Sequence, residues 1–162
     1  MAQERALSTM IDENDDSFLA TNLKGMMMTL LADWNARMDE GRAATEFAAI
    51  RPSDIRVFGQ LRGRKVKLSD VHRELGFSRQ AAQQAVERLV DHGVLAVAAA
   101  PGSRRDKTVS ITEKGQRLRA LAARQIREIE TLCAAAIGEA ETEALRRSLL
   151  RLIARIDEAG GR

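Results

Sequence analysis

Residues 68–95, LSDVHRELGFSRQAAQQAVERLVDHGVL, contain the pattern that decides the fold of this chain. Two stretches with apolar residues at helical spacing flank a short turn at Gly76, and Ser78 is a favourable N-cap for the second stretch. A helix over 78–92 would end at Gly93 and bury a single face, formed by Ala82, Ala85, Val86 and Leu89. The sequence therefore predicts two helices joined by a tight turn, the second of which has a polar outer face.

The residues that follow Gly93 change to the spacing of β-strands. Apolar residues alternate with small ones over 95–97, and polar residues alternate with apolar ones over 108–112. Pro101-Gly102-Ser103 lies between these runs and is typical of a turn. The connecting segment is basic, with Arg104, Arg105 and Lys107. This pattern predicts a β-hairpin with a positively charged tip.

Long helices are predicted on both sides of this central region. Apolar residues keep helical spacing from Phe18 to about Gly41, and again over 112–138 and 139–160. A shorter helix begins at Pro52, with an inner face of Ile55, Phe58 and Leu61, and residues 62–67 form a basic loop. The fold class is therefore mainly α: a winged helix-turn-helix lobe with a small β-hairpin wing, plus long N- and C-terminal helices.

We expect a single domain over residues 1–162 with two lobes. Residues 50–112 form the winged-helix lobe, and residues 17–46 and 113–160 form a helical lobe. A chain of this length can bury a substantial core. The apolar stripes of the helical lobe are too extensive for one copy to cover, which predicts a homodimer.

Composition and charge favour a protein that binds nucleic acid. Hydrophobic residues make up 44% and charged residues 30%, and no apolar run is long enough to span a membrane. No signal-peptide pattern opens the sequence, so we expect a cytoplasmic protein. Residues 51–107 hold 12 Lys and Arg against 6 Asp and Glu, whereas residues 1–50 hold 4 against 9. A localised basic region is typical of a polyanion-binding surface.

The helix predicted over 78–92 has the chemistry of a DNA-reading helix. The major groove of B-DNA accepts one α-helix, glutamine can bond adenine with two hydrogen bonds, and arginine can do the same with guanine. The side chains that could read bases are Arg79, Gln80, Gln83 and Gln84. The hairpin residues Arg104, Arg105 and Lys107 would then lie at the adjacent minor groove. Taken by itself, the same pattern is also typical of a solvent-exposed polar helix face beside an exposed hairpin.

Three segments resemble the MarR family of winged helix-turn-helix transcriptional regulators: IRVFGQL at 55–61, the stretch at 68–95, and RRDKTVSITEKG at 104–115. The flanking long helices also match the family layout. The resemblance implies a homodimer built by the first, fifth and sixth helices. It also implies that the fourth helix reads a palindromic operator and that a small-molecule effector releases the repressor.

Site residues follow from the resemblance by position. The base-reading positions are Arg79, Gln80, Gln83 and Gln84. The phosphate-contacting positions are Ser78, Arg88, Arg64 and Lys65. Arg105 falls on the wing arginine of the family. The chain departs from the family in two places, since Ser103 replaces the aspartate that braces the wing and His72 replaces a small residue of the third helix.

The resemblance also implies an effector pocket between the dimerisation helices and the DNA-binding lobe. We expect Met27, Trp34 and Phe58 to form its walls and Arg56 to pair with an anionic group. The predicted effector is a small aromatic or anionic molecule.

Other functions are less favoured by the residues present. The chain shows no nucleophile beside a base, no Gly-rich phosphate loop and no paired acids, so we expect neither an enzyme nor a cofactor. His72 and His92 lack metal ligands at suitable spacing, and Cys133 lies on an apolar helix face, which indicates a structural role. The alternative is a winged-helix module for protein–protein contact without an effector site, which would require an apolar fourth helix and a neutral wing.

Overall fold

The computed structural model describes residues 22–61, 63–68, 70–71, 78–100 and 106–160. Several expectations from the sequence lie outside these residues: the start of the helix predicted from Phe18, most of the first helix of the 68–95 pattern with His72, and the wing residues Ser103, Arg104 and Arg105. The chain divides into two compact units, Met1–Glu40 and Gly41–Arg162, each of which is described by itself.

The first unit consists, in its described part, of helix α3 (Leu23–Ala43), which continues into the second unit. The Asn22 side chain accepts a hydrogen bond from the backbone N–H of Gly25 at 2.9 Å and so caps the first turn. The long predicted helix is confirmed from Leu23 onward and ends two residues beyond Gly41. Its large apolar side chains are exposed, among them Leu23, Met26, Met27, Met28, Leu30 and Leu31.

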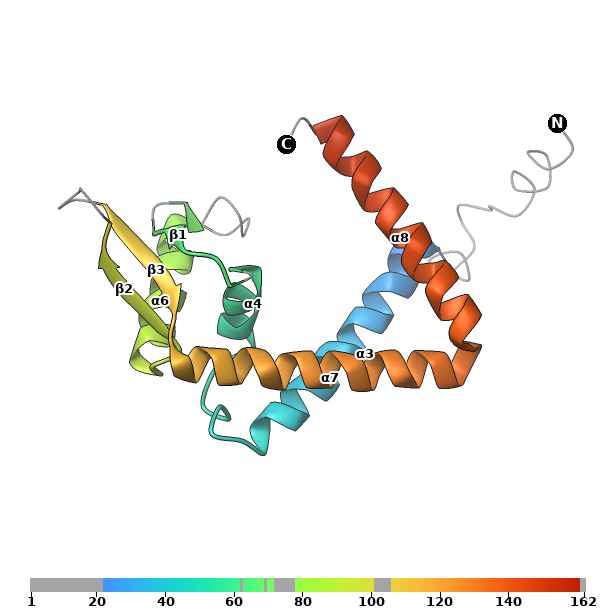
Figure 1. Ribbon diagram of the computed structural model, residues 1–162, viewed down its shortest axis with the longest axis horizontal. Helices are drawn as coiled ribbons and strands as arrows, with labels where there is room; N and C mark the ends of the chain where they lie inside the picture. Colours follow the sequence, from blue (N-terminus) through green and yellow to red (C-terminus); the bar gives the residue numbers. More distant parts are fainter. Residues whose placement is uncertain (1–21, 62, 69, 72–77, 101–105, 161–162) are drawn as a thin grey trace, which may run out of the picture. The chain divides into compact units, whose positions relative to one another are not determined.

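The second unit contains helices α4 (Pro52–Gln60) and α6 (Arg79–Asp91), and strands β1 (Val66–Lys67), β2 (Leu95–Ala99) and β3 (Lys107–Ile111). Helices α7 (Glu113–Ile137) and α8 (Glu139–Gly160) complete it (Figure 1). The three strands form an antiparallel sheet in the order β1-β3-β2, with Val66 opposite Val109 and Leu95 opposite Ile111. This arrangement confirms the predicted fold class.

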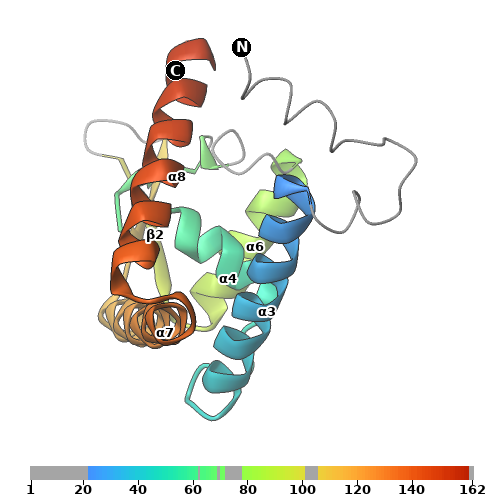
Figure 2. The same cartoon turned by 90° about the vertical axis from the view of Figure 1, so that its right-hand side faces the viewer.

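The core of the second unit lies where α4, α6, the sheet and the start of α7 meet. Residues from all of these elements pack into one cluster, whose most buried members include Val71, Val86, Leu89, Val94 and Val109. All four residues predicted for the inner face of α6 belong to it. Helices α4 and α6 pack against each other beside α7 (Figure 2). The core therefore fixes which side of α6 faces outward.

The structure corrects two expectations about this lobe. The segment 62–67 is not only a loop, because Val66 and Lys67 form β1 and pair with β3. Two residues are too few to show an alternating pattern, and the pairing is decided by the burial of Val66 against the core. The inner face of α4 also differs: Asp54 and Val57 are buried, whereas Ile55 is only partly buried.

Helix α7 begins at the end of the RRDKTVSITEKG motif. The Thr112 hydroxyl accepts a hydrogen bond from the Gly115 N–H at 3.0 Å and donates one to the Gly93 carbonyl at 2.6 Å. A Cβ at position 115 would lie 2.2 Å from the Val94 carbonyl oxygen. The glycine of the motif is thus required by a close approach of α7 to the backbone that follows α6.

Helices α7 and α8 meet at Gly138, whose φ of +88° is unfavourable for other residues. Cys133, in the last turns of α7, is half-buried rather than fully buried. No described residue of α8 is buried. Among the described residues, no helix has both the length and the apolar character needed to cross a membrane.

Candidate nucleic-acid interface

The N-terminal half of α6 presents the predicted base-reading residues to solvent. The Ser78 hydroxyl accepts a hydrogen bond from the Ala81 N–H at 3.2 Å, which confirms the predicted N-cap. The residues predicted to contact DNA from this segment are all exposed: Ser78, Arg79, Gln80, Gln83 and Gln84. Because the core stripe lies on the other side of the helix, Gln80 and Gln84 point directly outward, one turn apart.

The C-terminal half of the same outer face is acidic, a feature that is not among the predictions from the sequence. Glu87 and Asp91 are exposed there. The Gln83 side-chain amide donates a hydrogen bond to the Glu87 carboxylate at 3.0 Å. Phosphate groups are repelled by carboxylates and attracted by the positive end of the helix dipole. The charge distribution on α6 therefore favours approach to a polyanion through the N-terminal half.

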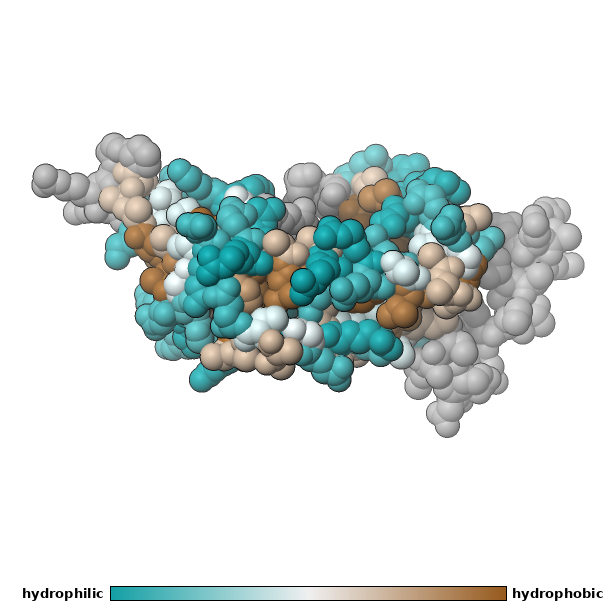
Figure 3. All heavy atoms as spheres, turned by 60° about the horizontal axis from the view of Figure 1, so that its bottom comes forward, coloured by the Kyte–Doolittle hydropathy of each residue, from teal (hydrophilic) through white to brown (hydrophobic). Residues whose placement is uncertain are grey.

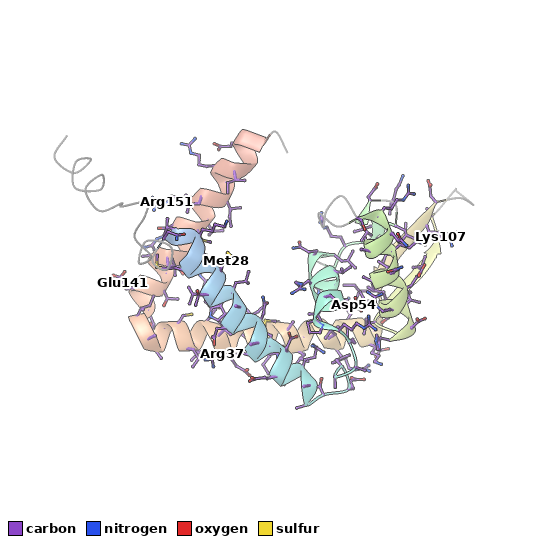
Figure 4. All side chains as sticks on the ribbon, turned by 180° about the vertical axis from the view of Figure 1, so that it is seen from behind. Met28, Arg37, Asp54, Lys107, Glu141 and Arg151 are labelled. Carbon is purple, nitrogen blue, oxygen red and sulfur yellow. The ribbon has the colours of Figure 1, made fainter. Side chains whose placement is uncertain are left out.

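Arg88 forms an ion pair that holds α6 to α4. Its Nε and Nη2 atoms donate hydrogen bonds to the two carboxylate oxygens of Asp54 at 2.8 and 2.7 Å. Asp54 is fully buried, whereas the Arg88 side chain is 34% exposed. These hydrogen bonds raise the pKa of Arg88. The guanidinium that the resemblance assigned to phosphate is therefore directed at Asp54 of α4, the residue labelled in Figure 4.

Basic side chains lie at the two ends of the sheet near α6. Arg64 and Lys65 are exposed in the turn before β1, where Gly63 adopts a φ of +76°. Lys107 is exposed at the start of β3, at the end of the β2–β3 hairpin that leads into its tip (Figure 4). The Asp106 carboxylate lies 3.9 Å from the Lys67 ammonium. The basic character of the wing stays a prediction, because Arg104 and Arg105 lie outside the described residues.

The segment that connects α3 to α4 is fastened by two arginines. The buried Arg42 donates hydrogen bonds to the carbonyls of Phe47 and Ile50. Arg117 of α7 makes two hydrogen bonds to the Glu46 carboxylate, at 2.9 and 3.2 Å, which lower the pKa of Glu46. These contacts tie the connection to α7 and so support the start of α4, on which α6 rests.

The residues predicted for an effector pocket belong to different units. Met27 and Trp34 lie in the first unit, and Arg56 and Phe58 lie in the second. Met27 and Arg56 are exposed and Trp34 is half-buried. Phe58 is only 5% exposed and packs in the core of the second unit. The pocket stays a prediction, with Phe58 the residue least accessible to a ligand.

Comparison with known proteins identifies the fold. No protein-family model and no curated protein sequence match the chain. Many solved structures do match. FabT from Streptococcus pneumoniae, solved in complex with DNA, has a TM-score of 0.70 and 14% identity over 85% of this chain and 96% of its own. A MarR transcriptional regulator from Methanosarcina mazei Go1 has a TM-score of 0.69 and 15% identity over 82% and 94%.

A third structure concerns BpsR from Bordetella bronchiseptica, whose DNA binding is described as regulated by 6-hydroxynicotinic acid. It has a TM-score of 0.60 and 18% identity over 83% of this chain and 94% of its own. The chain spans nearly the full length of all three proteins. These likenesses confirm the MarR-type winged-helix fold that the sequence resemblance implied.

Proposed function

We propose that this protein is a sequence-specific DNA-binding transcriptional regulator. The observation that carries the proposal is the outer face of α6, whose N-terminal half offers exposed Gln80 and Gln84 while its core stripe anchors the helix. Such a helix fits the major groove and can hydrogen-bond base edges. FabT, which shares the fold, has been solved with DNA. The outer face of α6 is polar, and the sequence places Arg104, Arg105 and Lys107 in the wing, whereas a protein–protein module would require an apolar α6 and a neutral wing.

The proposal assigns separate roles to the exposed residues. Base reading falls to Gln80 and Gln84, helped by Arg79 and Gln83. Phosphate contacts fall to Ser78, Arg64, Lys65 and the wing residues Arg104, Arg105 and Lys107. Contacts of the first kind give specificity, and contacts of the second kind give affinity that depends on salt.

We propose further that the protein acts as a homodimer. Exposed large apolar side chains recur along α7 and α8: Ile126, Leu132, Ile137, Leu145, Leu150, Leu152, Ile153 and Ile156. Apolar patches interrupt the hydrophilic surface on the face drawn in Figure 3. A second copy is the natural cover for such helices, since a dimer would also place two α6 helices on the two halves of a palindrome.

Repression and its release by a small molecule complete the proposal. BpsR responds to 6-hydroxynicotinic acid, and by analogy we expect a small aromatic or anionic effector for this protein. An effector acts only through different affinities for the DNA-bound and free arrangements, so it must change the spacing of the two α6 helices.

Substitution of Gln84 by alanine should reduce specificity. We expect a loss of about 1–3 kcal/mol on the preferred duplex for each protomer and little change on random DNA, because only a base contact is removed. Lys107→Ala should instead weaken binding to both duplexes and lower the log–log salt slope by about one per phosphate contact. The preferred duplex is first selected from a random pool, and binding is then measured by anisotropy over a salt series. Equal weakening of both duplexes by Gln84→Ala would exclude α6 as the base reader, and the absence of any preferred duplex would support the protein–protein alternative.

A charge on the apolar stripe of α8 should dissociate the dimer. Leu152 is 55% exposed in the isolated chain, and Leu152→Glu would place a carboxylate in the proposed interface. Since burial of an unpaired charge costs several kcal/mol per copy, we expect a monomer at micromolar concentration by sedimentation velocity. Arg147→Glu, on the opposite side of α8, is the control and should stay dimeric. A monomeric wild-type protein would contradict the proposal.

A further inference from the structure

We propose that the Asp54–Arg88 pair is a positioning element that sets the rotation of α6 and thereby aims Gln80 and Gln84 at the base edges. The inference rests on the DNA-binding function proposed above. It gives Arg88 a different role from the phosphate contact implied by the family resemblance.

The position of Arg88 on α6 makes this role possible. Gln80, Gln84 and Arg88 follow one another at intervals of four residues and so form one ridge along the helix. Any rotation of α6 that moves Arg88 moves the two glutamines in the same sense. Asp54 lies 34 residues earlier in the chain, on α4, so the pair joins two elements that are neighbours only in the tertiary structure.

The two hydrogen bonds of the pair fix the orientation of the Arg88 guanidinium relative to the Asp54 carboxylate. Two nearly equal hydrogen bonds, at 2.8 and 2.7 Å, join the planar guanidinium to both oxygens of a carboxylate that is itself fully buried. Such a paired contact fixes direction as well as distance, whereas an ammonium group at the same place would act as a point charge.

The apolar contact between α6 and α4 constrains the rotation of α6 about its axis less tightly than the ion pair does. Two of the four buried residues of α6 are alanines, Ala82 and Ala85, which have no side chain long enough to interlock with a neighbouring helix. A buried ion pair adds little net stability when its desolvation is counted, and its value lies in the arrangement it selects. The core stripe fixes which side of α6 faces outward, and the pair adds a directional constraint that sets the rotation more finely.

The arrangement also argues against a phosphate contact. Both donors that point from Arg88 toward α4 are used by Asp54. A phosphate that took this edge of the guanidinium would have to displace a carboxylate that, once deprived of its partner, would remain as an uncompensated charge in the core.

Arg88→Lys separates the two roles, because lysine keeps the charge but cannot form the paired contact. We expect the ratio of affinities for preferred and random duplexes to fall by about tenfold or more, while affinity for random DNA and its salt slope stay as in the wild type. A retained ratio would overturn the proposal. Lys65→Ala is the matched control: a lost phosphate contact should lower the salt slope and leave the ratio unchanged.

The double variant Asp54→Leu/Arg88→Met removes both charges of the pair and tests the same positioning role. An apolar pair of this kind commonly preserves folding, which circular dichroism and thermal melting would verify. We expect the ratio of affinities for preferred and random duplexes to fall as in Arg88→Lys. The salt slope should remain unchanged. A salt slope reduced by about one per protomer would show that Arg88 binds phosphate and would overturn the proposal.

Three further outcomes would also decide between these interpretations. Unfolding of both variants would overturn the proposal, because the pair would then be required for the fold itself. A wild-type protein that prefers no duplex would refute the proposed function and this inference together. A wild type that discriminates, combined with variants that discriminate equally well, would refute the inference alone.

Discussion

Replacement of Gly115 by alanine should destabilise the protein by about 3 kcal/mol, because the added methyl group would meet atoms that cannot easily move. A Cβ at this position would lie 2.2 Å from the Val94 carbonyl oxygen and 2.7 Å from the Ile111 Cγ2. The first of these is backbone, held by the hydrogen bond that its carbonyl accepts from the Thr112 N–H. Relief of the clash would push the start of α7 away from the sheet. Thermal melting at fixed protein concentration should show a decrease of about 6–12 °C.

Gly59→Ala is the matched control for this prediction. Gly59 lies in α4, and nothing lies within 4 Å of a Cβ built there. Alanine has the higher helix propensity, so we expect this variant to be unchanged or more stable by about 0.5–1 kcal/mol. Equal melting temperatures for the two variants would contradict the close approach of α7 to Val94.

Arg42→Ala should have the second large effect, with a loss of about 2–4 kcal/mol of unfolding free energy. Arg42 is only 5% exposed and donates hydrogen bonds to the carbonyls of Phe47 and Ile50. Alanine would take this donor from the buried Ile50 carbonyl, would remove one of the two donors to the Phe47 carbonyl, and would open space beside them. Because the connection leads directly into Pro52, we expect α4 to lose protection in hydrogen exchange before α7 does.

The control for Arg42 is Arg37 on the same helix. Arg37 makes a single 2.7 Å contact with Asp33, and both side chains are 53% exposed. An exposed pair at this spacing contributes only about 0.3–0.5 kcal/mol, so Arg37→Ala should melt close to the wild type. Comparable losses in the two variants would mean that Arg42 acts as a surface charge.

Elements with strong local signals were predicted well from the sequence. The start of α4 at Pro52, the N-cap at Ser78, the inner face of α6 and the start of the helix predicted over 112–138 all appear as expected. Each depends on residues within one or two helical turns of one another, so the pattern is complete within the segment. The exposure of Gln80 and Gln84 follows from the same periodicity.

The pairing of β1 with β3 and the inner face of α4 were not predictable in this way. Val66 forms a strand because Val109, 43 residues later, offers both a hydrogen-bonding edge and a place in the core. No local pattern in the sequence marks Arg42 or Asp54 as buried, because nothing near them in the chain indicates a partner. The carboxylate of Asp54 pairs with Arg88, and the guanidinium of Arg42 bonds to carbonyls of a turn.

The sequence by itself determined that the chain forms a winged helix with a polar reading helix, because helix periodicity, capping and turn residues are local properties. The tertiary structure alone decided what several of those residues do. It directs Arg88 to Asp54, and it requires glycine at position 115 through the approach of Val94. Both outcomes depend on atoms that come together only when distant segments pack, and the low dielectric and close packing of that interior determine which charge is paired and which side chain fits.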